Sequence, residues 1–180
     1  MTLILLEGRP GVGKTTVAAR LADLLRERDV PVVGFLTHEL RENGRRVGFE
    51  VESRDGRLAT LAHVGFRGGS RVGKYGVDVA AFERVALPAL ASPPRDGIVV
   101  VDELGKMELF SEPFRDAISR LLDDDVTVVA TVHVFSHPFT DALKARTGVE
   151  LIDITRASRD ELPRRLADRL VRETRGRRSR

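Results

Sequence analysis

Apolar runs alternate with amphipathic stretches along this chain. The runs that we expect to form strands cover residues 2–7, 30–37, 97–103, 126–134 and 149–155. Between them, apolar residues recur at helical spacing and predict helices over residues 14–28, 77–90, 112–122, 138–146 and 158–174. The run at 97–103 is too apolar to be half exposed, as is typical of a central parallel strand. Strand–helix alternation of this kind predicts a doubly wound α/β fold with a mainly parallel sheet.

Residues 40–65 depart from this alternation. In the segment RRVGFEVES, the apolar side chains recur at every second position, which is the period of a half-buried strand. Two favoured tight turns, Asn43-Gly44 and Asp55-Gly56, divide the segment. We therefore expect an antiparallel hairpin insertion at this point.

The chain has 180 residues, enough for one domain with a sizeable core. We expect a single domain over residues 1–174, a basic flexible tail over 175–180, and a monomer. No apolar run approaches the roughly 18–20 residues of a membrane span, so we expect no membrane partner. Cysteine is absent, which excludes disulfides and cysteine-ligated zinc and suits a cytoplasmic protein. The first residues run directly into a strand, and we expect no signal peptide.

The isoelectric point of 9.8 invites a nucleic-acid interpretation, so the position of the charge matters. Residues 164–180 contain eight arginines against Asp168 and Glu173, a local charge of +6, whereas the whole chain carries +3 and residues 1–163 carry −3. The basicity therefore belongs to the C-terminal segment. A solvated, frayed terminus is the interpretation we favour, and contact with RNA or acidic lipid is the alternative.

Residues 8–15, GRPGVGKT, match the phosphate-loop motif G-x-x-x-x-G-K-[ST] at every fixed position. The match lies between a predicted strand and a predicted amphipathic helix, which is the structural context that the motif requires. Its glycines allow successive N–H groups to turn inward and form a nest for phosphate oxygens. The N-terminus of the following helix adds partial positive charge. The chain is therefore expected to bind a nucleoside phosphate.

The residues of this loop have distinct expected roles. Lys14 would reach the β- and γ-phosphates, the Thr15 hydroxyl would ligate Mg²⁺, and Thr16 would hydrogen-bond the α-phosphate. The predicted nucleotide-binding residues here are Gly8, Arg9, Pro10, Gly11, Val12, Gly13, Lys14, Thr15 and Thr16.

The apolar run IVVV ends in two adjacent acids, Asp102 and Glu103. Two carboxylates at the end of a buried strand are costly unless a cation lies beside them, and a P-loop fold places its second magnesium-organising acid here. We expect Asp102 to serve the metal together with Thr15. We expect Glu103, which points in another direction, to orient and deprotonate an attacking water. A solvated carboxylate paired with Arg or Lys is the alternative for Glu103.

Two further patterns have weaker interpretations. The tetrapeptide DELG fits the Asp-x-x-Gly element of GTPases, but the Asn/Thr-Lys-x-Asp guanine reader that normally accompanies it is absent, so guanine specificity is unsupported. His133 and His137 are four residues apart, but Pro138 disfavours a helix there, and we interpret both as core or loop histidines and not as metal ligands.

The last predicted helix opens on a sequence that fits a capping box. Ser158 and Glu161 stand three residues apart, as that motif requires. Arg159 lies between them at the same sheet edge. We favour a structural role for it, with a nucleobase contact as the alternative.

These residues resemble a known family, the small P-loop nucleoside-triphosphatases first characterised from thermophiles, to which a human cancer-related nucleoside-triphosphatase is related. The resemblance extends over nearly the whole chain and is carried by GRPGVGKTT, GFLTHELRENGRRVGFEV, RVGKYGVDVAAFE, VVVDELGKMELFSEPFRDAI, VVATV and ITRASRDEL. DELGKMEL together with RVGKYGV is specific to the family. The resemblance implies a RecA-like P-loop fold and Mg²⁺-dependent hydrolysis of ATP, GTP, CTP and UTP to diphosphate and phosphate.

The resemblance also implies site residues. It adds a second nucleotide-binding segment, consisting of Val99, Val100, Val101, Asp102, Glu103, Leu104, Gly105 and Lys106. It implies that Lys106 is catalytic and offsets charge on the leaving γ-phosphate, with an ion pair to Glu108 or Glu103 as the alternative, and that Gly105 leaves room for that phosphate. Arg71, Lys74 and Tyr75 are implied to line the nucleotide site. The sequence departs from the family at Ser158, where Asn is common, and in its Arg-rich terminus.

Two other functions remain open from the sequence. One is a P-loop kinase for a small molecule or nucleotide. Such kinases carry an Arg-rich lid over the phosphates, and Lys144 and Arg146 are the weak candidates for it in this sequence. A nucleotide-switched RNA-binding module that uses the basic tail is the other.

Overall fold

The computed structural model describes residues 2–124 and 126–178. In this part of the chain nine strands form one sheet: β1 (Thr2–Gly8), β2 (Val32–Glu42), β3 (Arg45–Ser53), β4 (Leu58–His63), β5 (Ser70–Val72), β6 (Tyr75–Val77), β7 (Ile98–Leu104), β8 (Thr127–His133) and β9 (Val149–Asp153). The helices are α1 (Lys14–Arg26), α2 (Val79–Leu90), α3 (Glu112–Asp123), α4 (Pro138–Lys144) and α5 (Leu162–Arg178), with a short 3₁₀ helix at Glu108–Phe110. None of the described helices is both long and apolar enough to cross a membrane.

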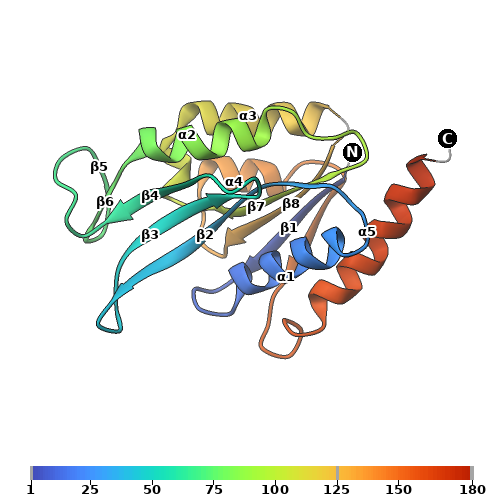
Figure 1. Cartoon of the computed structure of the whole chain (residues 1–180), viewed down its shortest axis with the longest axis horizontal. Helices are drawn as coiled ribbons and strands as arrows, with labels where there is room; N and C mark the ends of the chain where they lie inside the picture. Colours follow the sequence, from blue (N-terminus) through green and yellow to red (C-terminus); the bar gives the residue numbers. More distant parts are fainter. Residues whose placement is uncertain (1, 125, 179–180) are drawn as a thin grey trace.

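The strands follow the order β5-β6-β4-β3-β2-β7-β8-β1-β9 across the sheet. From β2 to β9 all pairings are parallel, and from β2 to β5 all are antiparallel. Helices α2 and α3 lie on one face of the sheet, where α2 packs on β2, β3 and β4, and α1 and α5 lie on the other face (Figure 1). The predicted doubly wound fold with an antiparallel insertion is therefore confirmed.

Both faces of the parallel strands are buried, and alternate residues of β1 show how. Leu3 and Leu5 pack into the cluster under α2 and α3, while Ile4 and Leu6 pack into the cluster under α1 and α5. All four side chains are fully buried. Because each face has its own helical layer, the strands are apolar at nearly every position.

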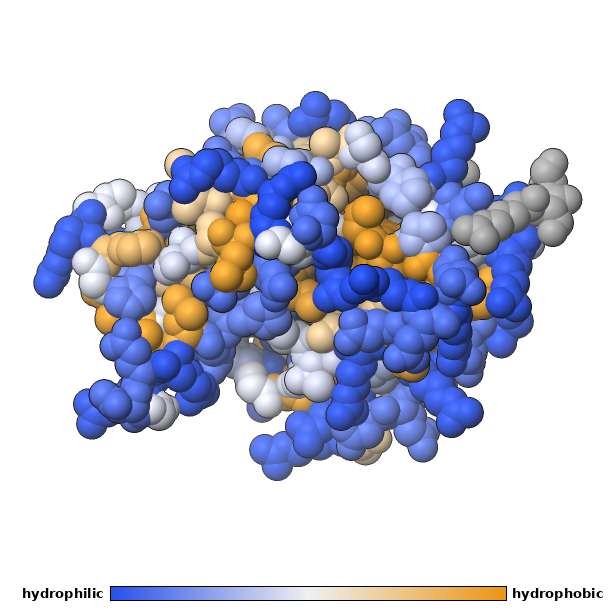
Figure 2. Space-filling model, in the orientation of Figure 1, coloured by the Kyte–Doolittle hydropathy of each residue, from blue (hydrophilic) through white to orange (hydrophobic). Residues whose placement is uncertain are grey.

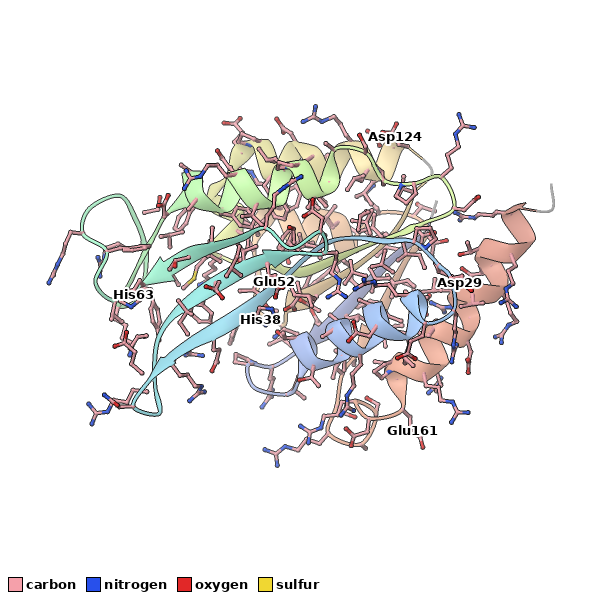
Figure 3. The ribbon with its side chains drawn as sticks, viewed as in Figure 1. Asp29, His38, Glu52, His63, Asp124 and Glu161 are labelled. Atoms are coloured by element: carbon pink, nitrogen blue, oxygen red, sulfur yellow. The ribbon has the colours of Figure 1, made fainter. Side chains whose placement is uncertain are left out.

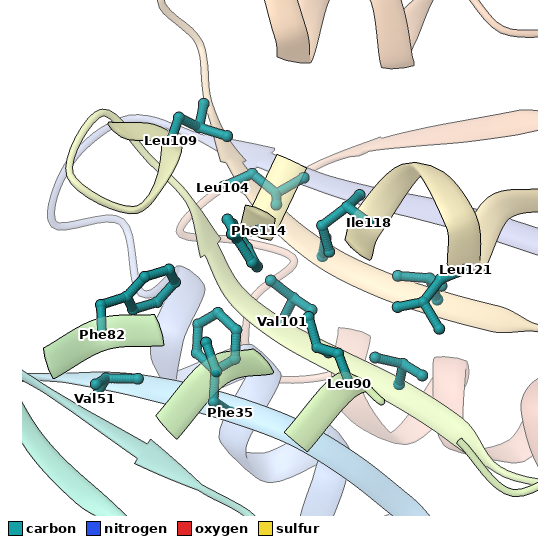
Figure 4. Close-up of a cluster of buried hydrophobic side chains, with 14 of the residues drawn as sticks. Phe35, Val51, Phe82, Leu90, Val101, Leu104, Leu109, Phe114, Ile118 and Leu121 are labelled. Atoms are coloured by element: carbon teal, nitrogen blue, oxygen red, sulfur yellow. The ribbon is translucent and has the colours of Figure 1, made fainter. Parts of the chain in front are cut away.

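Three aromatic rings anchor the cluster under α2 and α3 (Figure 4). Phe35 of β2 and Phe114 of α3 both meet Phe82 of α2, with ring centroids 5.4 and 5.0 Å away in edge-on geometry. Such pairs add roughly 0.5–1.5 kcal/mol beyond the area that they bury. They fix α2 and α3 against the strand that leads into the antiparallel part.

Strand β2 belongs to both parts of the sheet. Its first half pairs in parallel with β7 and its second half in antiparallel fashion with β3. The predicted turn follows, where Asn43 and Gly44 take positive φ angles of 48° and 75°. His38 of β2 and Glu52 of β3 lie side by side across this pair, with 3.0 Å between Nε2 and Oε2 (Figure 3).

Several boundaries differ from the predictions by two to five residues, and β2 extends to Glu42 instead of ending at 37. The antiparallel part continues into the β5–β6 hairpin, whose strands have three residues each and carry too little pattern to be recognised. Helix α5 begins at Leu162 and not at 158, because the Ser158 side chain bonds back to Thr155 and makes a separate turn instead of a capping box. The helix also continues to Arg178, and the rest of the predicted tail lies outside the described residues.

Most of the surface on the face shown in Figure 2 is hydrophilic. Apolar residues on the face shown in Figure 2 form separate patches between hydrophilic ones.

Candidate functional site

The carboxyl ends of β1, β7 and β8 meet at one edge of the sheet. Gly8 of β1 lies opposite His133 of β8, and Leu104 of β7 lies opposite Val132. Clefts at this edge of an open α/β sheet are the usual ligand sites. The phosphate loop, the two adjacent acids and the end of β8 are therefore brought together.

The glycines of the phosphate loop have different reasons to be glycine. Gly11 and Gly13 have φ angles of 76° and 108°, in the left-handed region that other residues avoid. At Gly8, by contrast, the difficulty is space, because a Cβ atom would lie 2.7 Å from Cγ1 of Val12. Gly13 caps α1, so the free N–H groups of that helix open onto the loop.

Lys14 is the first residue of α1 and is buried, with 7% of its surface exposed. Its ammonium group donates to the Gly8 carbonyl at 3.2 Å and lies 3.5 Å from Oε2 of Glu103. The ammonium group of Lys14 is thus paired with the Glu103 carboxylate and hydrogen-bonded to the backbone of the loop.

Asp102 is almost completely buried at the end of β7. Its Oδ1 accepts a 2.6 Å hydrogen bond from Thr131 of β8, and its backbone carbonyl accepts one of 2.5 Å from Thr37 of β2. Burial raises the pKa of Asp102 to about 6, although hydrogen bonds from Thr131 and Thr15 act in the opposite direction. The peptide bond between Asp102 and Glu103 is cis.

One oxygen of Asp102 has no protein partner. Oδ2 is buried without a hydrogen bond. The Thr15 hydroxyl lies near the same carboxyl group and acts to lower its pKa. Carboxylate and hydroxyl oxygens are ligands that Mg²⁺ prefers, and this ion is usually held by one or two protein oxygens together with substrate phosphates and water. The described residues contain no cluster of three His, Asp or Glu suited to a metal. The donor set at Asp102 and Thr15 therefore fits Mg²⁺ bound with nucleotide.

The raised pKa of Asp102 predicts an unusual pH dependence of stability. Its ordinary pKa is about 3.9, so between about pH 4 and pH 6 the native state binds more protons than the unfolded state, and stability falls as pH rises through this window. Asp102→Asn removes this penalty and can keep the bond from Thr131. In nucleotide-free, metal-free buffer we expect the variant to be more stable than wild type by up to about 3 kcal/mol at pH 8, and equal to it near pH 4.

Urea unfolding at the two pH values measures this difference. A wild-type protein that is as stable as the variant at pH 8 would contradict the assignment of a penalty to the buried carboxylate.

Glu103 lies between the side chains of His133 and Lys14. His133 Nε2 is 2.5 Å from its Oε1, and Lys14 approaches its other oxygen. Burial acts to raise the pKa of Glu103, but the hydrogen bond and charge of His133, together with the charge of Lys14, outweigh it and hold the pKa below its ordinary value. Glu103 is therefore a carboxylate that is held in place and partly exposed, at 22%.

A third acid, Glu108, is buried beside this pair. Burial first, and then repulsion by Glu103, hold the pKa of Glu108 well above its ordinary value. A Cβ atom on Gly105 would lie 2.7 Å from Oε2 of Glu108 and 2.9 Å from Oε1 of Glu103. Gly105 thus makes room for two carboxyl groups of the protein, which is a different reason from the phosphate clearance that the resemblance implies.

These groups line one cavity of about 500 Å³. From the predicted segments it receives Pro10, Gly11, Lys14, Thr15, Asp102, Glu103, Leu104, Gly105 and Lys106. Val99, Val100 and Val101 are fully buried in β7, where they hold Asp102 at the strand end. Thr16 is exposed at the start of α1 and does not line the cavity.

Several other candidates also lie near the loop. Lys106 is exposed at the rim, and no ion pair in the described chain involves it, so the alternative of a pair with Glu108 or Glu103 is not seen. Arg159 donates to the Val12 carbonyl at 3.3 Å and packs its side chain against Gly13. It therefore lies directly against the phosphate loop.

The candidates from the β5–β6 hairpin and from the proposed lid lie differently with respect to the cavity. Of the three residues of the β5–β6 hairpin, Tyr75 lines it, whereas Arg71 and Lys74 bond to backbone carbonyls nearby. Lys144 pairs with Glu7, and Arg146 with Asp123, so neither is poised as a lid over the phosphate loop. His133, which pairs with Glu103, and His137, which caps α4, also line the cavity.

Sequence reasoning missed Thr131, His133 and Glu108 as site residues. Thr131 and His133 could have been found from their position, because they stand at the carboxyl end of an apolar strand that is expected to end at the same edge of the sheet. Nothing in the sequence, however, states that β8 lies between β1 and β7. Their contacts with the two acids depend on that order.

A mixed α/β sheet with a phosphate loop after its first strand is the fold of the P-loop nucleoside-triphosphatases, as predicted. The family model described as NTPase matches residues 3–167. The chain belongs to this NTPase family, and the resemblance inferred from the sequence is confirmed.

Named relatives agree over most of the chain. It is 44% identical to "Nucleoside-triphosphatase THEP1" of Thermofilum pendens over 91% of this chain and 92% of the relative. It is 36% identical to the human "Cancer-related nucleoside-triphosphatase", with 88% and 91% covered. The crystal structure of THEP1 from Aquifex aeolicus superimposes with a TM-score of 0.85 at 34% identity, over 94% of this chain and 99% of that one.

Proposed function

We propose that this chain hydrolyses nucleoside triphosphates to nucleoside diphosphate and phosphate, with Mg²⁺ as cofactor and little discrimination between bases. The observation that carries the proposal is the position of Glu103, an ionised carboxylate held by His133 in the same cavity as the phosphate loop. The names of the relatives support the same reaction class.

The proposed reaction begins with a change of partner at Lys14. When phosphates occupy the loop, its ammonium group leaves Glu103 and the Gly8 carbonyl for the β- and γ-phosphate oxygens. Glu103, still held by His133, then accepts a proton from a water molecule. The water oxygen forms a bond to the γ-phosphorus while the bond from that phosphorus to the β–γ bridging oxygen breaks.

A magnesium ion held at Thr15 and Asp102 would supply charge neutralisation at the phosphates when bound. The protein residues supply position and proton transfer. Lys106 lines the same cavity, and we assign it the role of offsetting charge on the γ-phosphate.

Weak base discrimination is supported by the loop beside the phosphate site. The Ser158 hydroxyl is hydrogen-bonded to Thr155, and Arg159 donates a hydrogen bond to the backbone of the phosphate loop. A guanidinium plane can stack on any base without reading its edge.

Phosphate release from ATP, GTP, CTP and UTP, each with Mg²⁺ or with EDTA, tests the proposal. We expect similar release from all four nucleotides with the metal and none with EDTA. Release from a single nucleotide would overturn the broad specificity. An absence of release from any of them would overturn the hydrolysis.

A further inference from the structure

Thr131 of β8 is a buried polar residue in an apolar strand, and its position follows from the alternation of side chains. Val100 of β7 and Val129 of β8 both pack into the cluster under α1 and α5. Because alternate residues of a strand share a face, the next residues on that face are Asp102 and Thr131. Thr131 is fully buried there, and its hydroxyl donates to Oδ1 of Asp102 at 2.6 Å. The strand thus places one hydroxyl beside the acid.

Asp102 is held at two points by threonines of the strands on either side of β7. Thr37 of β2 donates to its backbone carbonyl at 2.5 Å, and Thr131 of β8 donates to its carboxylate. The first bond fixes the main chain and leaves the carboxylate free to rotate. The last torsion of an aspartate side chain has broad, roughly two-fold preferences, so it sets no orientation by itself. The bond from Thr131 therefore decides which oxygen points where.

The other carboxylate oxygen is left without a partner. With Oδ1 of Asp102 bonded to Thr131, Oδ2 is buried and makes no hydrogen bond within the described chain. A buried oxygen of this kind carries a free-energy cost that a bound cation would remove. In metal sites, hydrogen bonds from outside the ligand set commonly orient the ligating carboxylates. The bond from Thr131 has the place of such a contact.

We propose that Thr131 is a positioning residue for the metal: its hydroxyl turns Asp102 so that Oδ2 is presented to the Mg²⁺ ion that accompanies the nucleotide. The proposal rests on the Mg²⁺ cofactor proposed above. Thr131 does not line the cavity, so it acts through Asp102 and not on the nucleotide. Its hydroxyl therefore sets how far Mg²⁺ strengthens nucleotide binding, and it has no effect on the part of the binding that needs no metal.

Thr131→Val tests this role, because valine keeps the shape of threonine and removes the hydroxyl. The measured quantity is the affinity for a fluorescent, non-hydrolysable ATP analogue over a series of Mg²⁺ concentrations and in EDTA. In EDTA we expect wild-type affinity, since the contacts of Lys14 and the loop backbone are unchanged. We expect the Mg²⁺ concentration that gives half of the metal-dependent gain to rise about tenfold or more, which is the usual cost of losing such an outer contact.

Three further variants separate positioning from simple packing. Thr131→Ser keeps the hydroxyl and should respond to Mg²⁺ as wild type does. Thr174→Val removes a buried hydroxyl that donates to the Leu170 carbonyl at 2.8 Å in α5, and it should change nothing. In Asp102→Asn the metal has already lost its carboxylate, so adding Thr131→Val should cause no further change in the Mg²⁺ response. A further loss in that double variant would contradict an action through Asp102.

The positioning role is overturned if Thr131→Val responds to Mg²⁺ as wild type does, or if its affinity falls equally with Mg²⁺ and with EDTA. Should this variant fail to fold, Thr131→Ser and Thr131→Ala make the same comparison, because they differ only by the hydroxyl.

Phosphate release from ATP by the wild-type protein is the independent measure of hydrolysis. If Mg²⁺ strengthens wild-type binding through Thr131 and no phosphate is released, hydrolysis fails and the positioning role stands. If phosphate is released and Mg²⁺ does not affect wild-type binding, the reverse holds.

Discussion

Glu103→Gln is expected to lower the turnover of nucleoside triphosphate by on the order of a hundredfold or more while leaving nucleotide affinity in place. Glutamine has nearly the same shape, so it fits beside Gly105 and can still contact His133. It lacks the basic carboxylate that takes the proton from water. The effect should therefore appear in kcat and not in binding.

A natural control is present in the same chain. Glu52 also pairs with a histidine, His38, but this pair is exposed on the antiparallel strands (Figure 3). Glu52→Gln should leave turnover close to wild type. Steady-state phosphate release and titration with a fluorescent nucleotide measure the two quantities. Turnover of Glu103→Gln within twofold of wild type would remove Glu103 from the reaction.

Lys14→Ala is expected to weaken nucleotide binding by about a hundredfold, since a hydrogen bond to a charged group contributes roughly 1.5–3 kcal/mol and this lysine makes more than one. In the variant, His133 remains as a contact of Glu103. Binding of a Mg²⁺-nucleotide by calorimetry measures the effect. Lys74→Ala, which alters an exposed lysine on the β5–β6 hairpin, is the control. Wild-type affinity in Lys14→Ala would contradict the phosphate-loop assignment.

The phosphate loop could be predicted because all of its chemistry is local. Eight consecutive residues specify the turn, the nest and the start of α1, and the structure shows those features in the same order. The pair Asp102 and Glu103 could be predicted almost as well, because a buried strand that ends in two acids requires an explanation. The hydrogen bond that Thr131 donates could not, because it joins residues 29 apart whose strands become neighbours only in the folded sheet.

The limits of the predicted elements have similar causes. The period-two pattern predicted the insertion over 40–65, and the tight turn at Asn43-Gly44 is present. The β5–β6 hairpin was missed, because three-residue strands separated by a glycine turn carry almost no period. Ser158 fits a capping box by spacing alone, but its partner is Thr155, and spacing cannot distinguish the two outcomes.

The continuity of β2 has an evolutionary consequence. One half of this strand is built into the parallel layer that carries the phosphate loop, and the other half carries the hairpins that wall the cavity. We expect substitutions in the hairpins to alter the walls of the cavity and to leave in place the strands that position Lys14 and Asp102. The walls of the cavity are therefore expected to be able to change in evolution independently of the strands that hold the phosphate loop.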